Sequence, residues 1–274
     1  MKYAKVFVIT SGKGGVGKTT ITANLGASLA AKGFNVCLID GDIGLKNLDL
    51  VLGLENRIVY TILDVIKGNR SVTEVLVKHK LLKNLSLLAS SQIANKDMVS
   101  PEDMKDIIDK LSKHFHFILI DSPAGIERGF KNAIAAAQHA IIVTTPDLTA
   151  ISDADRVTGL LENSGFTDKN ISLIVNRLKP KMVKKNEMVS PEDIQNALAI
   201  ELIGVITDSE EILLSTNEGK PIVLDSEKRL SIVFDNITER MNNNFIPIEE
   251  DLKKLNQSPE GFFAMIKKLF KKEE

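Results

Sequence analysis

The sequence predicts an α/β fold, a doubly wound and mostly parallel sheet with helices on both faces. Short apolar runs recur along the chain, and segments with helical spacing lie between most of them. Strands that are apolar throughout are typical of parallel sheets, which are covered on both faces by their crossover helices. The first apolar run leads directly into a glycine-rich turn. Because such sheets bind ligands at the carboxyl ends of their strands, we expect a binding site there.

Seven apolar runs are predicted to form the strands, at residues 4–10, 36–39, 85–89, 115–120, 140–144, 171–175 and 202–206. A helix at 20–31 carries small and apolar residues at helical spacing and stops at Lys32-Gly33, a cationic last turn followed by a glycine cap. Two more helices begin after Ser100 and Ser190, since each serine precedes Pro-Glu-Asp and so places proline and acids in the first turn. A last core helix is expected at about 228–241.

Composition excludes several classes of protein. The 274 residues are 43% hydrophobic and 26% charged, which suffices for the core of one α/β domain. The net charge of −1 argues against a broad surface for nucleic acid, so no nucleic-acid partner is expected. Cys37 is the only cysteine, so one chain cannot build a disulfide framework or a cysteine-ligated cluster. The apolar run 6–9 is too short for a signal peptide, and no segment offers the roughly 18 apolar residues of a membrane span. We therefore expect a cytoplasmic protein.

The domain is predicted to cover residues 1–241, followed by a polar linker at 242–258 and a terminal amphipathic helix at 259–274. The apolar face of this helix comes from Phe262, Phe263, Met265, Ile266, Leu269 and Phe270, and its cationic flanks from Lys267, Lys268, Lys271 and Lys272. A short helix of this kind suits the interface of a membrane that contains anionic lipid. The other interpretation is a terminal helix packed on its own domain, which the polar linker and the lysines fit less well.

Residues 12–19 read Gly-Lys-Gly-Gly-Val-Gly-Lys-Thr, the P-loop pattern, between a predicted strand and a predicted helix. Its glycines let backbone N–H groups point at phosphate oxygens, and the helix start adds partial positive charge. Lys18 is expected to reach the β- and γ-phosphates of ATP, and Thr19 to bind Mg²⁺. The predicted nucleotide-binding residues here are Gly12, Lys13, Gly14, Gly15, Val16, Gly17, Lys18, Thr19 and Thr20. The alternative is a glycine-rich turn with an exposed lysine, which pattern and context both disfavour.

Two strand ends supply candidate acids for phosphoryl transfer. The apolar run 115–120 ends at Asp121, the position of the acid that supports the metal ion in such sites. Asp40 and Asp42 follow the strand 36–39 in a glycine-containing loop that is able to close over a γ-phosphate. We expect Asp42 to orient the attacking water. An ordinary acidic turn is the other interpretation of Asp40 and Asp42.

The P-loop has a second lysine, Lys13, near its start, which gives the deviant Walker A motif Lys-Gly-Gly-Val-Gly-Lys-Thr at 13–19. With this motif the chain resembles the MinD/ParA family of dimerising ATPases. The sequences Asp-Gly-Asp-Ile-Gly-Leu-Lys-Asn-Leu-Asp at 40–49 and Asp-Ser-Pro-Ala-Gly-Ile at 121–126 are closer still to the MinD branch, whose members position bacterial division sites. The similarity runs from the first strand to the last residues.

The resemblance implies an ATP-dependent homodimer in which Lys13 crosses the interface and completes the partner's catalytic site. It implies that Asn176, in the sequence Ile-Val-Asn-Arg, recognises adenine, although this motif alone is also consistent with a loop. It places Asp153 on a helix where regulatory partners dock, although this motif alone is also consistent with a helix cap. Those partners would be a division inhibitor similar to MinC, and a protein similar to MinE, or another, that stimulates the ATPase. The dimer would then lie on the inner face of the cell membrane until hydrolysis releases it.

Other functions share much of this pattern. A DNA-partitioning ATPase of the family should carry a basic surface patch instead of an apolar terminal helix. A flagellar-number regulator usually has an N-terminal extension, whereas here the first predicted strand begins at residue 4. Iron–sulfur members of the superfamily need paired cysteines. The rival from a different class is a binding module that ATP merely gates, with Asp42 and Asp121 inert, and measured ATP turnover separates it from an ATPase.

Overall fold

The computed structural model describes residues 3–42, 47–91, 98–225 and 227–251. Its eight strands form one sheet in the order β3-β4-β2-β5-β1-β6-β7-β8. The strands are β1 Lys5–Thr10, β2 Val36–Asp40, β3 Val77–Lys78, β4 Leu85–Leu88, β5 Phe117–Asp121, β6 His139–Thr144, β7 Ile171–Leu178 and β8 Glu201–Thr207. All neighbours pair in parallel except β3, which pairs antiparallel with β4 at the edge. The apolar runs of the sequence identified seven of these strands and missed β3, because two residues are too few for a periodic signal.

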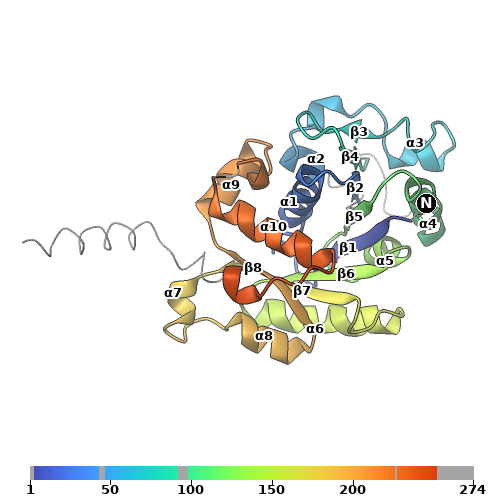
Figure 1. Ribbon diagram of the computed structural model, residues 1–274. Helices are drawn as coiled ribbons and strands as arrows, with labels where there is room; N and C mark the ends of the chain where they lie inside the picture. Colours follow the sequence, from blue (N-terminus) through green and yellow to red (C-terminus); the bar gives the residue numbers. More distant parts are fainter. Residues whose placement is uncertain (1–2, 43–46, 92–97, 226, 252–274) are drawn as a thin grey trace, which may run out of the picture.

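The helices cover both faces of the sheet, as the fold class predicted (Figure 1). They are α1 Lys18–Ala31, α2 Leu48–Val51, α3 Ile62–Ile66, α4 Pro101–Leu111, α5 Arg128–Ile134, α6 Leu148–Asn163, α7 Pro180–Val183, α8 Pro191–Leu198, α9 Glu210–Asn217 and α10 Arg229–Met241, with short 3-10 turns at Glu55–Arg57 and Ile222–Leu224. Both predicted serine caps are confirmed, since Ser100 and Ser190 each accept a hydrogen bond from the backbone N–H three residues later, at 3.1 Å.

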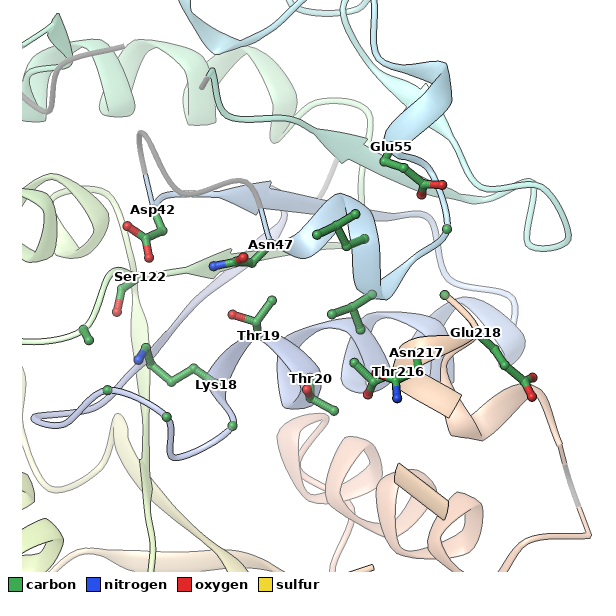
Figure 2. Close-up of a pocket in the computed structure, with 18 of the residues that line it drawn as sticks. Lys18, Thr19, Thr20, Asp42, Asn47, Glu55, Ser122, Thr216, Asn217 and Glu218 are labelled. Atoms are coloured by element: carbon green, nitrogen blue, oxygen red, sulfur yellow. The ribbon is translucent and has the colours of Figure 1, made fainter. Parts of the chain in front are cut away.

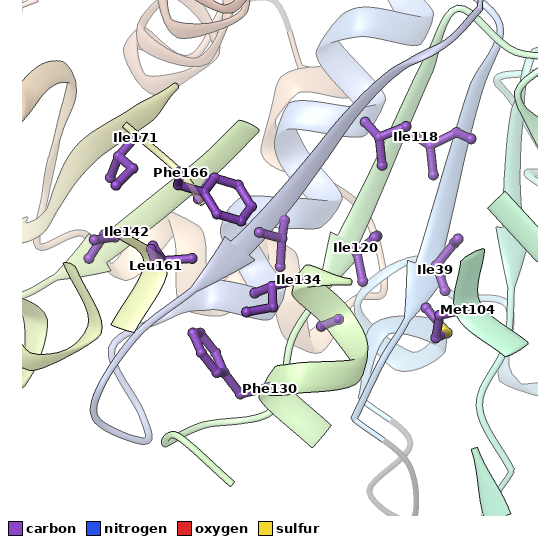
Figure 3. Close-up of a cluster of buried hydrophobic side chains, with 14 of the residues drawn as sticks. Ile39, Met104, Ile118, Ile120, Phe130, Ile134, Ile142, Leu161, Phe166 and Ile171 are labelled. Carbon is purple, nitrogen blue, oxygen red and sulfur yellow. The ribbon is translucent and has the colours of Figure 1, made fainter. Parts of the chain in front are cut away.

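Alternation along the strands divides the core into two layers. Val6 and Val8 of β1 face a cluster formed with α4, α5, α6 and α8, while Phe7 and Ile9 face a cluster formed with α1 and α10. Figure 3 shows the first cluster, where Ile120 of the sheet meets side chains of the covering helices. Each fully buried aliphatic or aromatic side chain contributes about 1.5–3 kcal/mol relative to exposure, so these two layers supply most of the stabilisation of the sheet.

Helix α1 is packed unusually close to the sheet, and this positions the loop that precedes it. A Cβ atom on Gly26 would lie 2.5 Å from a methyl group of Leu38 in β2, so any larger residue would force that buried side chain to move. Strands β2 and β4 lie on one side of β1 in the sheet, and β6, β7 and β8 lie on the other side. This switch point, at the carboxyl end of β1, is where α/β sheets bind ligands, and the predicted P-loop lies there.

The segment after α10 does not leave the domain at once. Asp251 has no exposed surface, and its carboxylate accepts a hydrogen bond from Arg240 of α10 at 2.6 Å. The first part of the predicted linker, 242–251, is therefore attached to the domain. The predicted terminal helix at 259–274 lies outside the described residues.

Candidate functional site

The P-loop joins β1 to α1 and leaves several backbone donors available. Gly15 and Gly17 have φ angles of +76° and +100°, in the left-handed region that glycine adopts without strain. Within the described residues, the backbone N–H groups of Gly14 through Thr19 donate no hydrogen bond to protein. Adjacent unpaired N–H groups at a helix start form an anion site, so the loop fits phosphate.

Asn176, at the end of β7, fixes the last turn of this loop. Its side-chain Nδ2 donates to the carbonyl of Val16 at 2.7 Å, and the side chain is 7% exposed. A Cβ atom on Gly17 would lie within 2.4 Å of the same Nδ2 atom. Glycine at position 17 is therefore required twice, by its φ angle and by the approach of Asn176. The structure places the residue predicted to recognise adenine directly against the P-loop.

Lys18 is buried and points along the loop. Only 7% of the residue is exposed, and its Nζ atom donates to the hydroxyl of Ser11 at 2.9 Å. Burial lowers the pKa of Lys18, while the carboxylates of Asp121 and Asp42 oppose this shift. The Ser11 hydroxyl in turn donates to the carbonyl of Lys13 at 2.7 Å. Ser11, which no sequence motif singled out, thus connects the two lysines of the loop.

Asp121 ends β5 between the ends of β1 and β2, where it meets α1. Burial raises its pKa to about 6, although hydrogen bonds from Thr19 and Thr22 and the charge of Lys18 act in the opposite direction. Thr22 donates from Oγ1 to Oδ1 of Asp121 at 3.4 Å. Asp40 lies opposite Asp121 in the paired strand β2, and burial also raises its pKa, reinforced by Asp121. Two buried carboxyls, of Asp121 and Asp40, therefore lie side by side at the ends of paired strands.

A cavity of about 800 Å³ opens over the P-loop. Figure 2 shows Lys18, Thr19, Asp42 and Ser122 around one end of it, so the residues predicted for phosphate, metal and water share one space. Its other wall comes from α2, α9 and the turns that follow them. The lining residues that sequence reasoning missed are Asn47, Leu50, Val51, Gly53, Glu55, Ser122, Ala124, Arg177, Thr216, Asn217, Glu218 and Gly219. Asn47, Ser122, Ala124 and Arg177 lie in segments that carry the family resemblance, which assigned them no role. No local motif marks the others, because distant turns bring them together.

A second cavity, of about 450 Å³, adjoins the first across Gly17 and Thr20. Asn176 lines it, together with Ile21 of α1, Ile206 of β8 and Phe234 of α10. Polar and charged residues, among them Asp208 and Glu210, complete its lining. A pocket that combines apolar side chains with an amide and two acids suits a heteroaromatic base better than a phosphate chain. The two cavities therefore offer phosphate and base sites in sequence.

Lys13 and Asp153, the two residues assigned to dimer and partner contacts, both lie near α6. Lys13 Nζ donates to Thr149 Oγ1 at 3.0 Å and forms an ion pair with Asp147 Oδ1 at 3.4 Å. Partial burial disfavours ionisation of Asp147, but hydrogen bonds from Thr145, Thr149 and Ala150, with the charge of Lys13, hold its pKa below the usual range. Lys13 is half-exposed, so this contact is weak enough to break.

Asp153 is half-buried on α6, and its backbone packs on the start of the P-loop. A Cβ atom on Gly12 would lie 2.3 Å from the Asp153 carbonyl oxygen. The helix predicted to receive partners therefore contacts the nucleotide loop directly.

None of the helices formed by the described residues is both long and apolar enough to span a bilayer.

A phosphate loop between β1 and α1, with a buried lysine, a facing carboxylate and an adjoining base cavity, defines a P-loop nucleotide-binding protein. The chain belongs to the CobQ/CobB/MinD/ParA nucleotide-binding family, whose model matches residues 7–222, and the family predicted from the sequence is confirmed.

Particular relatives are septum site-determining proteins. MinD of Thermotoga maritima is 58% identical over 267 residues, covering 96% of this chain and 98% of that protein. The structure of a MinC:MinD cell division complex from Aquifex aeolicus includes a chain that matches with a TM-score of 0.83 and 46% identity, covering 89% of this chain and 98% of that one. MinD of Pyrococcus horikoshii complexed with Mg-ADP matches with a TM-score of 0.78 and 30% identity, covering 87% and 96%.

Proposed function

We propose that the chain is an Mg²⁺-dependent ATPase that hydrolyses ATP to ADP and phosphate. The observation that carries this proposal is that Lys18, Thr19 and Asp42 line the P-loop cavity together. The buried carboxyl of Asp121 lies directly behind them, where it accepts a hydrogen bond from Thr19 and interacts with Lys18. Phosphoryl transfer to water needs phosphate positioning, charge neutralisation and an oriented nucleophile, and these residues provide one group for each need. The relative complexed with Mg-ADP supports the same assignment.

Each residue of the site has a distinct part in the proposed reaction. The N–H groups of the loop and the Lys18 ammonium bind the phosphates, and the buried position of Lys18 excludes water from that contact. Mg²⁺, held through Thr19 and Asp121, would neutralise charge on the phosphate oxygens. Asp42, at the rim of the cavity, orients the attacking water, and Asn176 binds adenine in the adjoining cavity.

We infer further that ATP produces a symmetric dimer and that Lys13 acts across its interface. Lys13 is held by Thr149 and Asp147 on the surface of its own protomer, through contacts that stabilise by at most about 1 kcal/mol. Lys13 can therefore leave these contacts and reach a second nucleotide at a small cost in free energy. In the same way ATP would activate membrane binding by the terminal helix, since two tethered helices raise apparent affinity by roughly 10²–10⁴ over one.

In the cell the protein would position the division septum from the inner face of the membrane. It would recruit a division inhibitor similar to MinC, and be released when a MinE-like or other partner stimulates hydrolysis, with α6 around Asp153 as the docking helix. The relative in a MinC:MinD complex supports the first of these partners. A flagellar-number or DNA-partitioning role, or an ATP-gated binding module, is the competing function.

ATP turnover by three variants tests the site. Lys18→Ala should abolish hydrolysis, and Asp42→Ala should bind ATP but hydrolyse it several orders of magnitude more slowly. Asp168→Ala, which removes an exposed carboxylate between α6 and β7, is the matched control and should behave as the parent. Unchanged turnover in Asp42→Ala would remove that residue from catalysis. Binding of ATP without turnover in the parent chain would favour the gated module.

Light scattering and liposome co-sedimentation test the assembly. The Asp42→Ala protein should dimerise with ATP and not with ADP, and only the dimer should sediment with anionic liposomes. A Lys13→Ala chain that still dimerises with ATP would contradict the trans role of that lysine. A chain truncated after Ser258 should still dimerise with ATP but should no longer sediment with liposomes. Phe262→Glu or Ile266→Glu should have the same effect as the truncation.

A further inference from the structure

Phe245 is the most exposed large hydrophobic residue of the described chain, with 92% of its surface accessible. It lies in the loop between α10 and Asp251, the last described residue. Single exposed apolar residues are ordinary on protein surfaces, so exposure alone indicates nothing. The significance of Phe245 depends on how its loop is held and on the membrane helix predicted further along the chain.

Arg240 fixes this loop to the domain. Its Nε and Nη2 atoms donate to the carbonyls of Ile246 and Pro247, at 2.8 and 3.0 Å. Its Nη1 atom donates to the Asp251 carboxylate at 2.6 Å and to a carbonyl of β8 at 2.8 Å. The Arg240 side chain is 8% exposed and Asp251 is fully buried, so the ion pair between them is shielded from solvent. Phe245 is therefore presented from a rigid support.

The loop is suited to an apolar environment. Residues 242–248 read Asn-Asn-Asn-Phe-Ile-Pro-Ile and carry no charge, in a chain that is 26% charged. The backbone N–H groups of residues 242, 243 and 244 donate to carbonyls of α10 at 3.0, 2.9 and 2.9 Å, and Arg240 occupies the carbonyls of residues 246 and 247. These five backbone groups are already bonded within the protein, so they lose little solvation when the loop enters a membrane interface.

The chain beyond Asp251 brings a membrane close to this loop. Only seven residues lie between Asp251 and Pro259, where the predicted membrane helix begins, and the eight Cα–Cα steps that join these two residues span at most about 29 Å. A membrane that holds the helix therefore passes near Asp251, and Arg240 attaches the Phe245 loop to that same residue. We propose that Phe245 inserts into the lipid surface beside the terminal helix and fixes the orientation of the ATPase domain on the membrane.

This inference rests on the membrane binding proposed above, and it assigns that binding a contact within the folded domain. Glu249 and Glu250 are exposed beside the loop. Attraction to anionic lipid therefore does not drive the contact, and burial of the phenyl ring does. The effect of Phe245 should accordingly be the same on vesicles with different fractions of anionic lipid that all retain the protein.

The chain contains no tryptophan, so Phe245→Trp introduces a single fluorescent probe. The full chain with this substitution is mixed with Mg-ATP and phosphatidylglycerol/phosphatidylcholine vesicles whose acyl chains are brominated or not. Brominated lipid should quench the introduced indole in the vesicle-bound protein. Leu81→Trp is the matched control, because Leu81 is 68% exposed beside β3, at the opposite edge of the sheet from β8. The control protein should bind vesicles equally, and its indole should remain unquenched.

The outcomes distinguish this inference from the proposed function. Co-sedimentation of the Phe245→Trp protein without quenching would overturn the inference and leave the terminal helix as the anchor. Absence of co-sedimentation with ATP would overturn both. Before vesicles are added, the Phe245→Trp protein should emit as a solvent-exposed indole, and emission typical of a buried indole would show that another part of the chain covers this position, which also refutes the proposal.

A second variant measures the contribution to affinity. Phe245→Ser should bind vesicles roughly tenfold more weakly per protomer, since burying a phenyl ring gains at least about that factor. Its thermal stability and its ATPase rate without vesicles should match the parent, because the ring packs on nothing in the described chain. Leu81→Ser should leave vesicle affinity unchanged. Equal affinities for Phe245→Ser and the parent would contradict the proposal.

Discussion

Replacing Gly12 by alanine should damage the P-loop through α6, a helix far from it in the sequence. An added Cβ atom would lie 2.3 Å from the carbonyl oxygen of Asp153 and 2.6 Å from its carbonyl carbon and Cβ. These are backbone or backbone-attached atoms, so no side-chain rotation relieves the clash. Two other glycines of the same loop serve as controls, because an added Cβ on Gly14 would meet only Ala124 at 3.8 Å, and one on Gly15 would meet nothing within 4 Å.

The contact distances determine how much stability Gly12→Ala should lose. A carbon–oxygen contact normally needs about 3.3 Å, so the loop or α6 must move by roughly 1 Å. Overpacking of this kind costs about 2 kcal/mol, which corresponds to a fall of roughly 4–6 °C in Tm for a chain of this size. Gly15→Ala keeps the space but forces alanine to φ +76°, for about 1 kcal/mol. Gly14→Ala should be near neutral.

Thermal denaturation of the nucleotide-free proteins, followed by ATP turnover, tests this order. The expected loss of stability is largest for Gly12→Ala, intermediate for Gly15→Ala and smallest for Gly14→Ala. Turnover by Gly12→Ala should fall about a hundredfold, since a displacement of 1 Å in a positioning element has effects of that size. Equal stability of Gly12→Ala and Gly14→Ala would refute the contact between α6 and the loop.

Four further predictions concern buried polar groups. Ser11→Ala removes the acceptor of the Lys18 ammonium and should lower the free energy of unfolding by about 1–2 kcal/mol in denaturant titrations. Ser11→Thr keeps the hydroxyl and should retain most of the parent stability. Because the pKa of Asp121 is raised to about 6, Mg²⁺-dependent ATP affinity should weaken as pH falls from 7 to 5, and Asp121→Asn should remove that dependence. The stability of the nucleotide-free protein should depend on pH in the opposite direction. The folded state binds the Asp121 proton more tightly than the unfolded state, so Tm should fall as pH rises from about 4 to 6. Thermal denaturation of Asp121→Asn should lack this part of the pH dependence. Asp251→Ala leaves the Arg240 guanidinium buried without its carboxylate and should cost about 3 kcal/mol in the same titrations, whereas a loss below about 1 kcal/mol would contradict the role of this pair in attaching the segment.

Much of the fold and the centre of the site could be predicted from local sequence. The strand, the P-loop and the helix follow one another directly between Lys5 and Ala31, so their order alone places Lys18 and Thr19 at a helix start. The caps at Ser100 and Ser190 are equally local, because a serine side chain bonds a backbone N–H three residues away. Apolar runs identified seven strands, since burial on both faces leaves few polar positions in them.

The order of the strands was decided only in the tertiary structure. Spacing shows that the strand ending at Asp121 exists, but not that it lies between β1 and β2, next to Thr22 and opposite Asp40. That arrangement depends on which crossover packs on which face, and it is responsible for the raised pKa of Asp121. The local sequence does not show which strands become neighbours when they are far apart in the chain.

The same distinction explains the contacts that the sequence did not reveal. The wall of the cavity formed by α2 and α9 depends on two turns whose glycines, Gly53 and Gly219, meet backbone to backbone although 166 positions separate them. The burial of Asp251 depends on an arginine in the preceding helix, and a polar stretch of this composition is otherwise typical of a free linker. Sequence alone determined the groups that bind phosphate, because a helix start and its glycines are chain neighbours. Tertiary packing decided which elements enclose them, because enclosure requires surfaces that only the complete sheet and its helices bring together.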